Sequence, residues 1–379
     1  MVSLRKTDVV VVGGGPAGLA AALSARSAGL AVCVVDFGAP PIEKACGEGL
    51  MPDGVAALRG LGVSLDGHGR PFHGIRFLDE RHVAEASFPR QAGVGIRRRD
   101  LHRLLAASAE AAGVDLLWRT RAIAIESEGL GTDKGLLPCR WIIGADGVHS
   151  VVRRWASLDP AGHGPRRLGL RRHFRAEPWT DFVEVHWAKG EQAYVTPVAR
   201  EEVCVALLGR AEEAGFDNLG RRFPRLHEKL GDAEPVSPLR GAPTATMRLR
   251  RVTRANIALI GDASAAIDAI SGDGLALAFH QAAALGAALR QGDLAFYESR
   301  HRQICRAPFL IARLLLLMDR HEALRSVALQ ALASGPGIFN GLLATHVGAR
   351  HPAAASLDIA ALGLRLLAQA AARLGSAIP

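Results

Sequence analysis

The sequence predicts an α/β protein, α+β overall, in which a parallel-sheet domain alternates along the chain with an antiparallel sheet and C-terminal helices follow. Three observations predict this fold. Apolar runs at residues 9–12, 141–143 and 257–260 each lead into a glycine, and Gly-Asp or Asp-Gly follows in two of them. Residues 169–208 alternate with period two, which is typical of an antiparallel sheet with one half-exposed face. Residues 301–379 are rich in Leu and Ala at helical spacing.

The first apolar run opens a strand–turn–helix–strand unit. It is followed by a G-x-G-x-x-G turn, a helix-like segment, a second apolar run over 31–35, and Asp36; the turn reads Gly13-Gly14-Gly15-Pro16-Ala17-Gly18. The first glycine permits the tight turn, the second lets a pyrophosphate approach the backbone, and the third lets helix and strand pack closely. The helix N-terminus attracts phosphate, and an acid after the second strand can accept hydrogen bonds from ribose hydroxyls. This unit predicts a Rossmann-like dinucleotide site without choosing between FAD and NAD, and the acid argues against the 2′-phosphate of NADP.

Composition bounds the remaining function classes. The net charge is +9, from 46 basic and 37 acidic residues, and the basic residues are scattered, so we expect no nucleic-acid binding. Five distant cysteines without a C-x-x-C pair indicate neither a disulfide framework nor a zinc site, and we expect no metal. We expect no signal peptide and no membrane-spanning helix, and hence a cytoplasmic protein, with peripheral membrane contact as a further option.

Residues 37–101 hold two candidate contacts with a ligand. The loop Lys44-Ala45-Cys46-Gly47-Glu48-Gly49 is either backbone held close to a flat ligand or an ordinary glycine loop before a helix over 53–61. Residues 74–78 and 83–88 read as strands. Arg97, Arg98 and Arg99 precede a helix expected to begin at Asp100, where positive charge opposes the helix dipole. Either a phosphate or a solvated basic corner would explain these arginines.

Two further strand–turn–helix units follow. The strand over 141–143 leads into Gly144-Ala145-Asp146-Gly147, and then Ser150 and Arg153. The strand over 257–260 leads into Gly261-Asp262 and then Gly272-Asp273-Gly274-Leu275, which open a helix to residue 289. Each unit places an acid and free N–H groups together.

The remaining segments give weaker signals. His186 in the antiparallel sheet is read as structural, because a lone strand histidine rarely has a catalytic role. Residues 211–232 read as one helix, and residues 335–352 as a break between C-terminal helices. We expect Arg306, Arg313 and Arg320 on one helix face and Phe309, Leu310, Leu314 and Leu317 on another. These helices either cover the dinucleotide domain and line a substrate tunnel or dock on a membrane or protein.

The three motifs in this order resemble the FAD-dependent monooxygenase superfamily typified by para-hydroxybenzoate hydroxylase, which also contains geranylgeranyl reductases and halogenases. The resemblance spans roughly residues 5–300 and implies FAD. It implies a Rossmann-like FAD-binding domain over 1–70, 95–165 and 250–300. It also implies an antiparallel-sheet substrate domain over 71–94 and 166–249. The remaining residues, 301–379, would form a C-terminal helical region.

The resemblance also implies residue roles. The turn from Gly13 to Gly18 would hold the pyrophosphate, and Asp36 the adenosine ribose. Arg98 would lie near the ribityl and pyrophosphate, and the backbone at Ala122 would meet adenine. Asp146 and Gly147 match the motif linked to FAD and to transient NAD(P)H contact. Asp262, after Gly261, would bind a ribityl hydroxyl; Gly274 and Leu275, after Gly272, would offer N–H groups to the flavin pyrimidine ring.

Two departures favour the reductase branch. The hydroxylases typically carry a histidine and paired prolines where this chain has Ala265, Asp268 and Ala269. The run from Asp268 to Gly274 looks like the D-P-x-T-G-E-G run of geranylgeranyl reductases, and the loop from Lys44 to Gly49 resembles their K-x-C-G-G-G loop. That loop faces the flavin, which makes Lys44 a cofactor contact and Cys46 and Glu48 candidate catalytic residues, although Cys46 could also be an inert thiol.

The implied function is an FAD-dependent oxidoreductase acting on a hydrophobic small molecule. We expect an NAD(P)H-dependent monooxygenase that hydroxylates an aromatic, polyketide-like or lipid-like substrate. The alternatives are a flavin-dependent reductase of isoprenoid or other alkenes, and a flavin-bearing accessory protein that modifies or docks on a partner. Halogenation is disfavoured because no W-x-W-x-I-P run occurs. The sequence leaves the substrate and the oligomeric state open.

Overall fold

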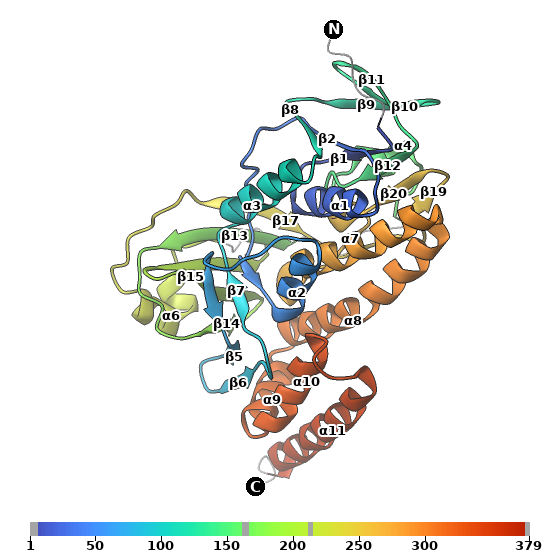
Figure 1. The fold of residues 1–379 in the computed structure, drawn as a ribbon. Helices are drawn as coiled ribbons and strands as arrows, with labels where there is room; N and C mark the ends of the chain where they lie inside the picture. The colour runs from blue at the N-terminus through green and yellow to red at the C-terminus, as the bar shows by residue number, and fades with distance from the viewer. Residues whose placement is uncertain (1–6, 161–166, 211–214, 376–379) are drawn as a thin grey trace.

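A six-stranded sheet, in the order β19-β20-β12-β1-β2-β8, lies in the upper part of the computed structural model as drawn in Figure 1. The structure describes residues 7–160, 167–210 and 215–375. All neighbours pair in parallel except β19 with β20. The strands are β1 (Val9–Val12), β2 (Val32–Asp36), β8 (Asp115–Trp118), β12 (Trp141–Gly144), β19 (Thr253–Arg254) and β20 (Ile257–Leu259).

Buried helices and a small sheet complete this core. Helix α1 (Pro16–Ser27) packs on the sheet and contacts both α3 (Arg98–Ala111) and α7 (Gly274–Gln291), and all three helices contribute side chains to the same core. Leu130 and Leu137 join the same core from a three-stranded sheet of β9 (Ala122–Glu126), β10 (Gly129–Thr132) and β11 (Gly135–Pro138). Because both faces of the parallel sheet are covered, its strands read as unbroken apolar runs.

The second sheet has seven strands in the order β17-β13-β16-β15-β14-β5-β6. They are β5 (Gly74–Leu78), β6 (Val83–Ser87), β13 (Arg167–Phe174), β14 (Phe182–Ala188), β15 (Glu191–Ala199), β16 (Glu202–Gly209) and β17 (Arg240–Thr244). All neighbours are antiparallel except β14 with β5. The predicted α/β fold with an antiparallel sheet is therefore confirmed.

The helix predicted over 211–232 is wrong where the structure describes it. Two short helices stand there, α5 (Leu219–Arg222) and α6 (Pro224–Leu230), and residues 211–214 lie outside the described residues. The break falls at Phe223, with φ −134° and ψ 65°, because the following proline disfavours helical geometry in the residue before it. Both helices cover the sheet face that carries Val195, Val203 and Val205.

Short elements join the two sheets. They are α2 (Pro52–Gly60), α4 (Val151–Trp155), the 3₁₀ turns η1 (Gly261–Ala263) and η2 (Ala269–Ser271), and five strands: β3 (Gly49–Leu50), β4 (Arg70–Phe72), β7 (Gly93–Gly95), β18 (Met247–Arg248) and β21 (Ala265–Ala266). The strands β3, β7 and β4 form a small sheet, which β15 contacts. The loop before β3 is thereby held between the parallel sheet and the seven-stranded sheet.

Four helices close the chain: α8 (Leu294–Arg320), α9 (Glu322–Ala333), α10 (Pro336–His346) and α11 (Pro352–Gly375). Helix α8 starts beside α7 and runs down to α9, α10 and α11, which lie at the bottom of the view in Figure 1. The predicted break over 335–352 is wrong for most of its length, because Pro336 occupies the first turn of a helix, where a proline loses no hydrogen bond. Leu332, Phe339 and Leu343 pack on Ala84 and Ala86 of β6, so these helices cover one end of the second sheet.

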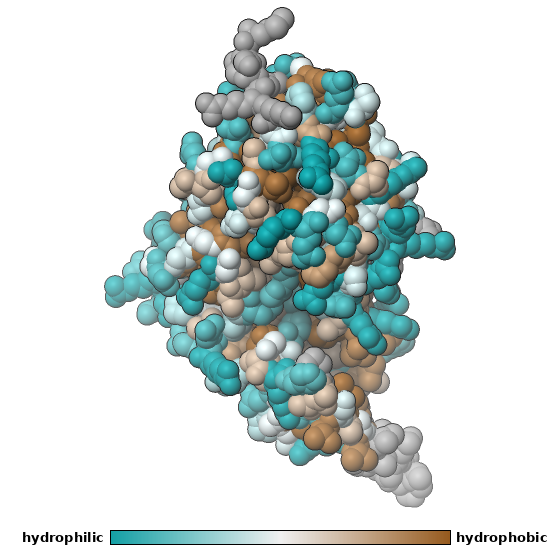
Figure 2. Space-filling view, turned by 45° about the vertical axis from the view of Figure 1, so that its right-hand side comes forward, coloured by the Kyte–Doolittle hydropathy of each residue, from teal (hydrophilic) through white to brown (hydrophobic). Residues whose placement is uncertain are grey.

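The face expected for the arginines of α8 also needs correction. At 100° per residue, Arg306, Leu310, Arg313 and Leu314 fall on one side of the helix. All four are exposed. Figure 2 shows hydrophobic side chains reaching the surface around the C-terminal helices. Among the described residues, no single helix is long and apolar enough to cross a membrane, although the pair Glu322–Ala333 and Pro336–His346, bent by 100°, passes by length and composition.

Candidate functional site

The glycine-rich turn lies between β1 and the N-terminus of α1. A Cβ at Gly13 would lie 2.4 Å from the carbonyl oxygen of Ala145, and one at Gly18 would lie 1.8 Å from the carbonyl oxygen of Gly13. These two glycines serve close packing. A Cβ at Gly15, by contrast, would meet no atom within 4 Å. Gly15 caps the helix and Pro16 occupies its first turn, so the first N–H groups of α1 are available to a phosphate.

Asp36 is tied to the same turn. Its Oδ2 accepts a hydrogen bond from Gly14 N–H at 2.7 Å, and its Oδ1 accepts one from Gly38 N–H at 2.7 Å. The carbonyl oxygen of Asp36 accepts from Thr120 N–H at 2.9 Å, which brings Ala122, at the start of β9, near this end of the site. Each carboxylate oxygen has a second lone pair, so Asp36 can still accept bonds from a ribose.

His102 supports this turn and was missed by the sequence. It is fully buried on α3, and its Nε2 lies 2.9 Å from the carbonyl oxygen of Gly14. Burial lowers the pKa of His102 despite this bond. The neutral ring therefore donates from Nε2 to Gly14 and holds the glycine-rich turn in place. No motif marks such a residue in the sequence, since a single helical histidine is a common core residue.

Three arginines, Arg97, Arg98 and Arg99, stand at the start of α3, and among the described residues only the Arg98 side chain has no acidic partner. Arg97 forms an ion pair with Glu202, and Arg99 lies 3.5 Å from Asp100. The buried Nε of Arg98 has no hydrogen-bond partner in the described part of the chain. The helix begins at Arg98, two residues before the predicted Asp100. Arg98 thus remains available for an anionic group, as a cofactor phosphate would require.

Asp146, in the second motif, accepts hydrogen bonds from the first turn of α4. Its Oδ2 accepts from Val151 N–H at 2.6 Å and Val152 N–H at 3.2 Å, while its buried Oδ1 has no partner among the described residues. Gly147 has φ +80° and no atom near a built Cβ. Arg153, held by the cap at Ser150, donates to the carbonyl oxygen of Ala263 at 3.1 Å. The second and third motifs are thereby joined.

The third motif lies against the first. A Cβ at Gly261 would lie 2.7 Å from the Cβ of Ala17, and Gly261 N–H donates to Gln281 at 2.8 Å. Asp262 forms a 2.8 Å ion pair with Lys44, and both side chains are partly exposed. Built Cβ atoms at Gly272 and Gly274 would meet nothing within 4 Å, which leaves the N-terminus of α7 at Leu275 open.

The loop from Lys44 to Gly49 is fixed on both sides. Thr196 of β15 donates to the carbonyl oxygen of Gly47 at 2.8 Å, and Lys44 reaches Asp262 on the opposite side. Cys46 is half-buried, and its Sγ accepts from Glu48 N–H at 3.4 Å. The two candidate catalytic residues are thus adjacent, in a loop that links the parallel sheet to the seven-stranded one.

Glu48 is the centre of a buried polar network. Its backbone has φ +61°, and only 2% of the residue is exposed. Its Oε1 accepts from Arg98 N–H at 3.0 Å, and its Oε2 lies 2.6 Å from His173 Nε2. Arg171 Nη1 lies 3.1 Å from His173 Nδ1. Because a guanidinium can only donate, Nδ1 accepts and the Nε2 proton faces Glu48.

This network also holds metal-type ligand atoms. Glu48, His173 and Cys204 present ligand atoms within 4.8 Å of one another, all buried. Arg171 Nε lies 3.6 Å from Glu48, and Arg171 also pairs with Glu43 at 2.7 Å. Since a guanidinium already supplies the positive charge, we assign these residues to an ion-paired network. Arg171 and His173 were not identified from the sequence, which predicts only period-two strands over residues 169–208.

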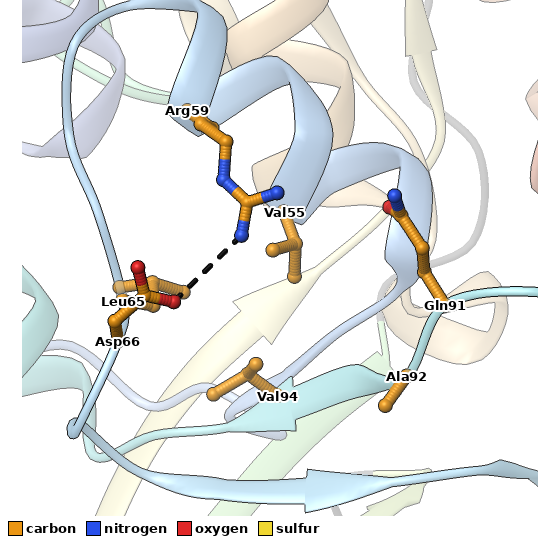
Figure 3. Close-up of a pocket in the computed structure, with 7 residues that line it drawn as sticks. All are labelled: Val55, Arg59, Leu65, Asp66, Gln91, Ala92 and Val94. Atoms are coloured by element: carbon orange, nitrogen blue, oxygen red, sulfur yellow. Dashed lines mark ion pairs between the residues drawn. The ribbon is translucent and has the colours of Figure 1, made fainter.

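Other candidates lie away from this site. His186 forms a 3.0 Å pair with Glu184, on the sheet face opposite Val185 and next to α5 and α6. A surface pocket of about 260 Å³ is bridged by the ion pair of Arg59 with Asp66 at 3.7 Å (Figure 3). None of the residues predicted for the site lines this pocket; its lining is Val55, Arg59, Leu65, Asp66, Gln91, Ala92 and Val94.

The arrangement fits an extended dinucleotide such as FAD. One end offers Asp36, the middle offers the α1 N-terminus and the free Nε of Arg98, and the far end offers Lys44, Asp262 and the open turn before α7. At Gly15, Gly272 and Gly274 a built Cβ would meet no atom within 4 Å, so the backbone there is open to a ligand. Acceptors for ribose, donors for phosphates and open backbone for a ring therefore follow one another in the order the cofactor needs.

Comparison with known proteins gives the same assignment. The FAD binding domain family matches residues 6–292. The menaquinone reductase of Mycobacterium tuberculosis H37Rv is 30% identical over 307 residues, 71% of this chain and 72% of the relative. The digeranylgeranylglycerophospholipid reductase of Methanothrix thermoacetophila is 27% identical over 334 residues, 79% and 83% of the two chains. The solved structure of a mutant 2-methyl-3-hydroxypyridine-5-carboxylic acid oxygenase shares the fold with a TM-score of 0.73, 23% identity and coverage of 83% and 93%.

Proposed function

The chain belongs to the FAD binding domain family and is an FAD-dependent oxidoreductase, and from that premise we propose that it reduces a carbon–carbon double bond in a hydrophobic, isoprenoid-like substrate. When bound, FAD carries a hydride from NAD(P)H to the substrate. The second hydrogen must arrive as a proton on the neighbouring carbon. The double bond becomes a single bond, and NAD(P)H is oxidised to NAD(P)⁺.

The observation that carries this proposal is the position of Cys46. Its loop is held by Thr196 on one side and by the Lys44–Asp262 pair on the other. The N–H of Glu48 donates to its sulfur at 3.4 Å, which fixes the direction of the side chain. Burial raises the pKa of Cys33 to about 12 and that of Cys139 and Cys305 to about 11, so those thiols hold their protons. Cys46 supplies the proton and regains it from water, since it is half-buried.

The residues beyond the loop support an apolar substrate. Val185, Trp187, Ile270, Ala312 and Leu329 form one buried apolar cluster between the seven-stranded sheet, the turn before α7 and the C-terminal helices. Tyr194 joins it and donates to the carbonyl oxygen of Ile270 at 2.6 Å. An isoprenoid chain would bind against the partly buried residues at the edge of this cluster, among them Ile267, Leu315 and Met318. Both reductases named above act, by their names, on isoprenoid-bearing molecules, which also supports the proposal.

Anaerobic turnover tests the proposal. Purified protein is reduced with NADH or NADPH without oxygen and mixed with a prenylated quinone or a geranylgeranyl lipid. We expect the flavin to be reoxidised and the prenyl chain of the product to gain two hydrogens on carbon, whereas reduction of a quinone ring would place both hydrogens on oxygen. Hydroxylation is the competing reaction, and it would instead require oxygen and add one oxygen atom to the product. A protein that holds FAD but reoxidises only with oxygen would overturn the reductase proposal.

A further inference from the structure

The C-terminal helices reach the turn before α7 through one histidine. His346, the last residue of α10, places its Nε2 2.9 Å from Oδ1 of Asp273. Asp273 immediately precedes Gly274, and the two paired side chains, of His346 and Asp273, are 16% and 5% exposed. His346 lies beyond the region 6–292 that the family matches. A part of the chain outside the FAD domain therefore contacts the turn expected to meet the flavin ring.

A free acceptor is left at this contact. Oδ2 of Asp273 is buried and has no hydrogen-bond partner among the described residues. A Cβ at the adjacent Gly274 would meet nothing within 4 Å. A buried carboxylate oxygen without a donor is costly, so a ligand that supplies one is expected. Unlike Asp268, which caps η2 through Ile270 N–H at 3.0 Å, Asp273 forms no side-chain cap on its own helix.

The charge at this contact is the second observation. A negative carboxylate beside the α7 N-terminus would repel the negative charge that a reduced flavin ring carries. Burial by itself would lower the pKa of His346, but the carboxylate of Asp273 reverses this and holds that pKa above its ordinary value of 6.5. The carboxylate of Asp273 therefore favours the imidazolium form of His346. Paired with Asp273, the imidazolium leaves the contact without net charge.

We propose that His346 is a positioning residue of the flavin site, which orients Asp273 and balances its charge so that Oδ2 accepts a hydrogen bond from the bound cofactor. The inference takes the identity of the cofactor from the family assignment and does not depend on the proposed reaction. It assigns the C-terminal helices a direct part in holding FAD.

Beyond Asp273, the charge of Asp53 also raises the pKa of His346. Asp53 of α2 is the other acid that faces His346, and its Oδ2 already lies 3.1 Å from His280 Nε2. Charged groups on other elements that pack against α10 have partners of their own: Asp358 with Arg350, Glu85 with Arg76, and Arg325 with the carbonyl oxygen of Met318. A change in the charge of His346 therefore acts on Asp273 first.

The test measures FAD affinity and midpoint potential, which require no substrate. His346→Gln should weaken FAD binding by roughly tenfold or more, because it leaves a buried carboxylate without its counter-charge. The double variant His346→Gln and Asp273→Asn should regain most of the lost FAD affinity. A merely structural role for His346 would not allow that recovery. The control is His280→Gln, which removes a partly exposed pair on the same helix α7 and should change the affinity less than about twofold.

The pH dependence gives an independent readout. Affinity for reduced flavin should fall as pH rises through the raised pKa of His346, because the proton that balances Asp273 is then lost. Asp273→Asn should flatten this dependence, and this variant decides the question if His346→Gln does not fold. Wild-type affinity in His346→Gln, or an unchanged pH profile in Asp273→Asn, would overturn the inference. A protein that binds FAD as described but fails to reduce alkenes would overturn only the proposed function.

Discussion

Glu48 adopts a backbone conformation that side chains rarely tolerate, with φ +61°, where the loop it resembles has glycine. The left-handed conformation costs a non-glycine residue about 1–2 kcal/mol. Here that cost is offset by a carboxylate that serves Arg98 N–H and His173 at once. Strained residues that persist in this way are often part of a functional site.

Replacing Glu48 separates the cost of its backbone strain from the stabilisation that its carboxylate provides. Glu48→Gly removes the backbone strain but leaves the buried Arg98 N–H and His173 Nε2 without their acceptor, at about 1–3 kcal/mol for each unsatisfied group. We expect the FAD-free variant to be less stable by roughly 1–3 kcal/mol in urea unfolding. Glu48→Gln, which keeps one acceptor, should lose less. A glycine variant as stable as the wild type would show that the carboxylate contributes nothing to the fold.

The thiol of Cys46 can be tested in the same loop. In Cys46→Ala, NAD(P)H should still reduce the flavin, whereas transfer to the substrate should slow by about 10²–10⁴-fold because the proton donor is lost. Cys139→Ala is the matched control, since Cys139 is also half-buried but packs against the core of the parallel sheet, outside the loop from Lys44 to Gly49. Stopped-flow measurement of the two half-reactions separates the steps. Unchanged turnover in Cys46→Ala would remove the thiol from the mechanism.

Two glycines of one turn should respond in opposite ways to alanine. Gly15 has φ −70°, which alanine adopts freely, and its Cβ would enter open space. Gly15→Ala should therefore fold normally but bind FAD about 10–100-fold more weakly, because the methyl group lies where a phosphate must approach. Gly18→Ala should destabilise the FAD-free protein itself, by roughly 1–3 kcal/mol or more. Thermal unfolding and FAD titration of both variants check this, and equal FAD affinity in Gly15→Ala and wild type would contradict it.

At the scale of elements, the sequence predicted what depends on local pattern and missed what depends on contacts. The strand before Gly13 and the period-two strands around Tyr194 carry their own signals, and both were predicted. The break at Phe223 was missed although Pro224 marks it, because the surrounding residues keep helical spacing. Arg171, His173 and His346 were missed because their partners, Glu43, Glu48 and Asp273, lie at least 73 residues away along the chain (346 − 273).

Helix α8 holds the last strands of the parallel sheet through one carboxylate. Glu298 Oε2 accepts from Val252 N–H, Thr253 N–H and Thr253 Oγ1, at 2.9, 3.1 and 2.8 Å. Burial alone would raise the pKa of Glu298, but these bonds and Arg302 lower it from the ordinary 4.5. The stabilisation is therefore fully present above pH 4.5 and is lost as pH falls through the lowered pKa.

Glu298→Gln should consequently show a pH-dependent loss of stability. We expect a loss of about 1–3 kcal/mol near neutral pH, and a difference from wild type that narrows as the solution is acidified. Urea unfolding across this range measures it. The exposed Glu110→Gln is the control and should change stability by less than about 0.5 kcal/mol at any pH. A constant difference between Glu298→Gln and wild type would mean that the charge of Glu298 is not involved.

At the scale of the whole molecule, buried ion pairs join the parts that must surround the cofactor. Arg167 of β13 pairs with Asp268 at 2.9 Å and lies 3.7 Å from Asp319 of α8. Arg171, further along the same strand, belongs to the Glu48 network, and His346 meets Asp273. The seven-stranded sheet and the C-terminal helices are each tied to a loop at the flavin end. Breaking one partner of such a buried pair is costly, so these contacts fix how the parts sit around the site.

The exposed face of α8 suggests how an apolar substrate reaches this site. Leu310 and Leu314 are 56% and 52% exposed, and Arg306 and Arg313 lie on the same side of the helix. Exposed leucines flanked by arginines favour the surface of an anionic bilayer, where each basic residue contributes about 1 kcal/mol. We therefore propose that the protein docks on anionic membranes through this face. The membrane would then be the source of an isoprenoid substrate.

Vesicle flotation tests the docking face. The FAD-loaded protein should float with phosphatidylglycerol vesicles at low salt but stay in the soluble fraction when the vesicles are phosphatidylcholine, and added salt should weaken the binding because it screens the arginines. The double variant Leu310→Asp and Leu314→Asp should abolish flotation. Leu239→Asp, at an exposed leucine beside β17, should not. Because all three leucines are at the surface, these changes leave the core intact, and a double variant that still floats would place the membrane contact elsewhere.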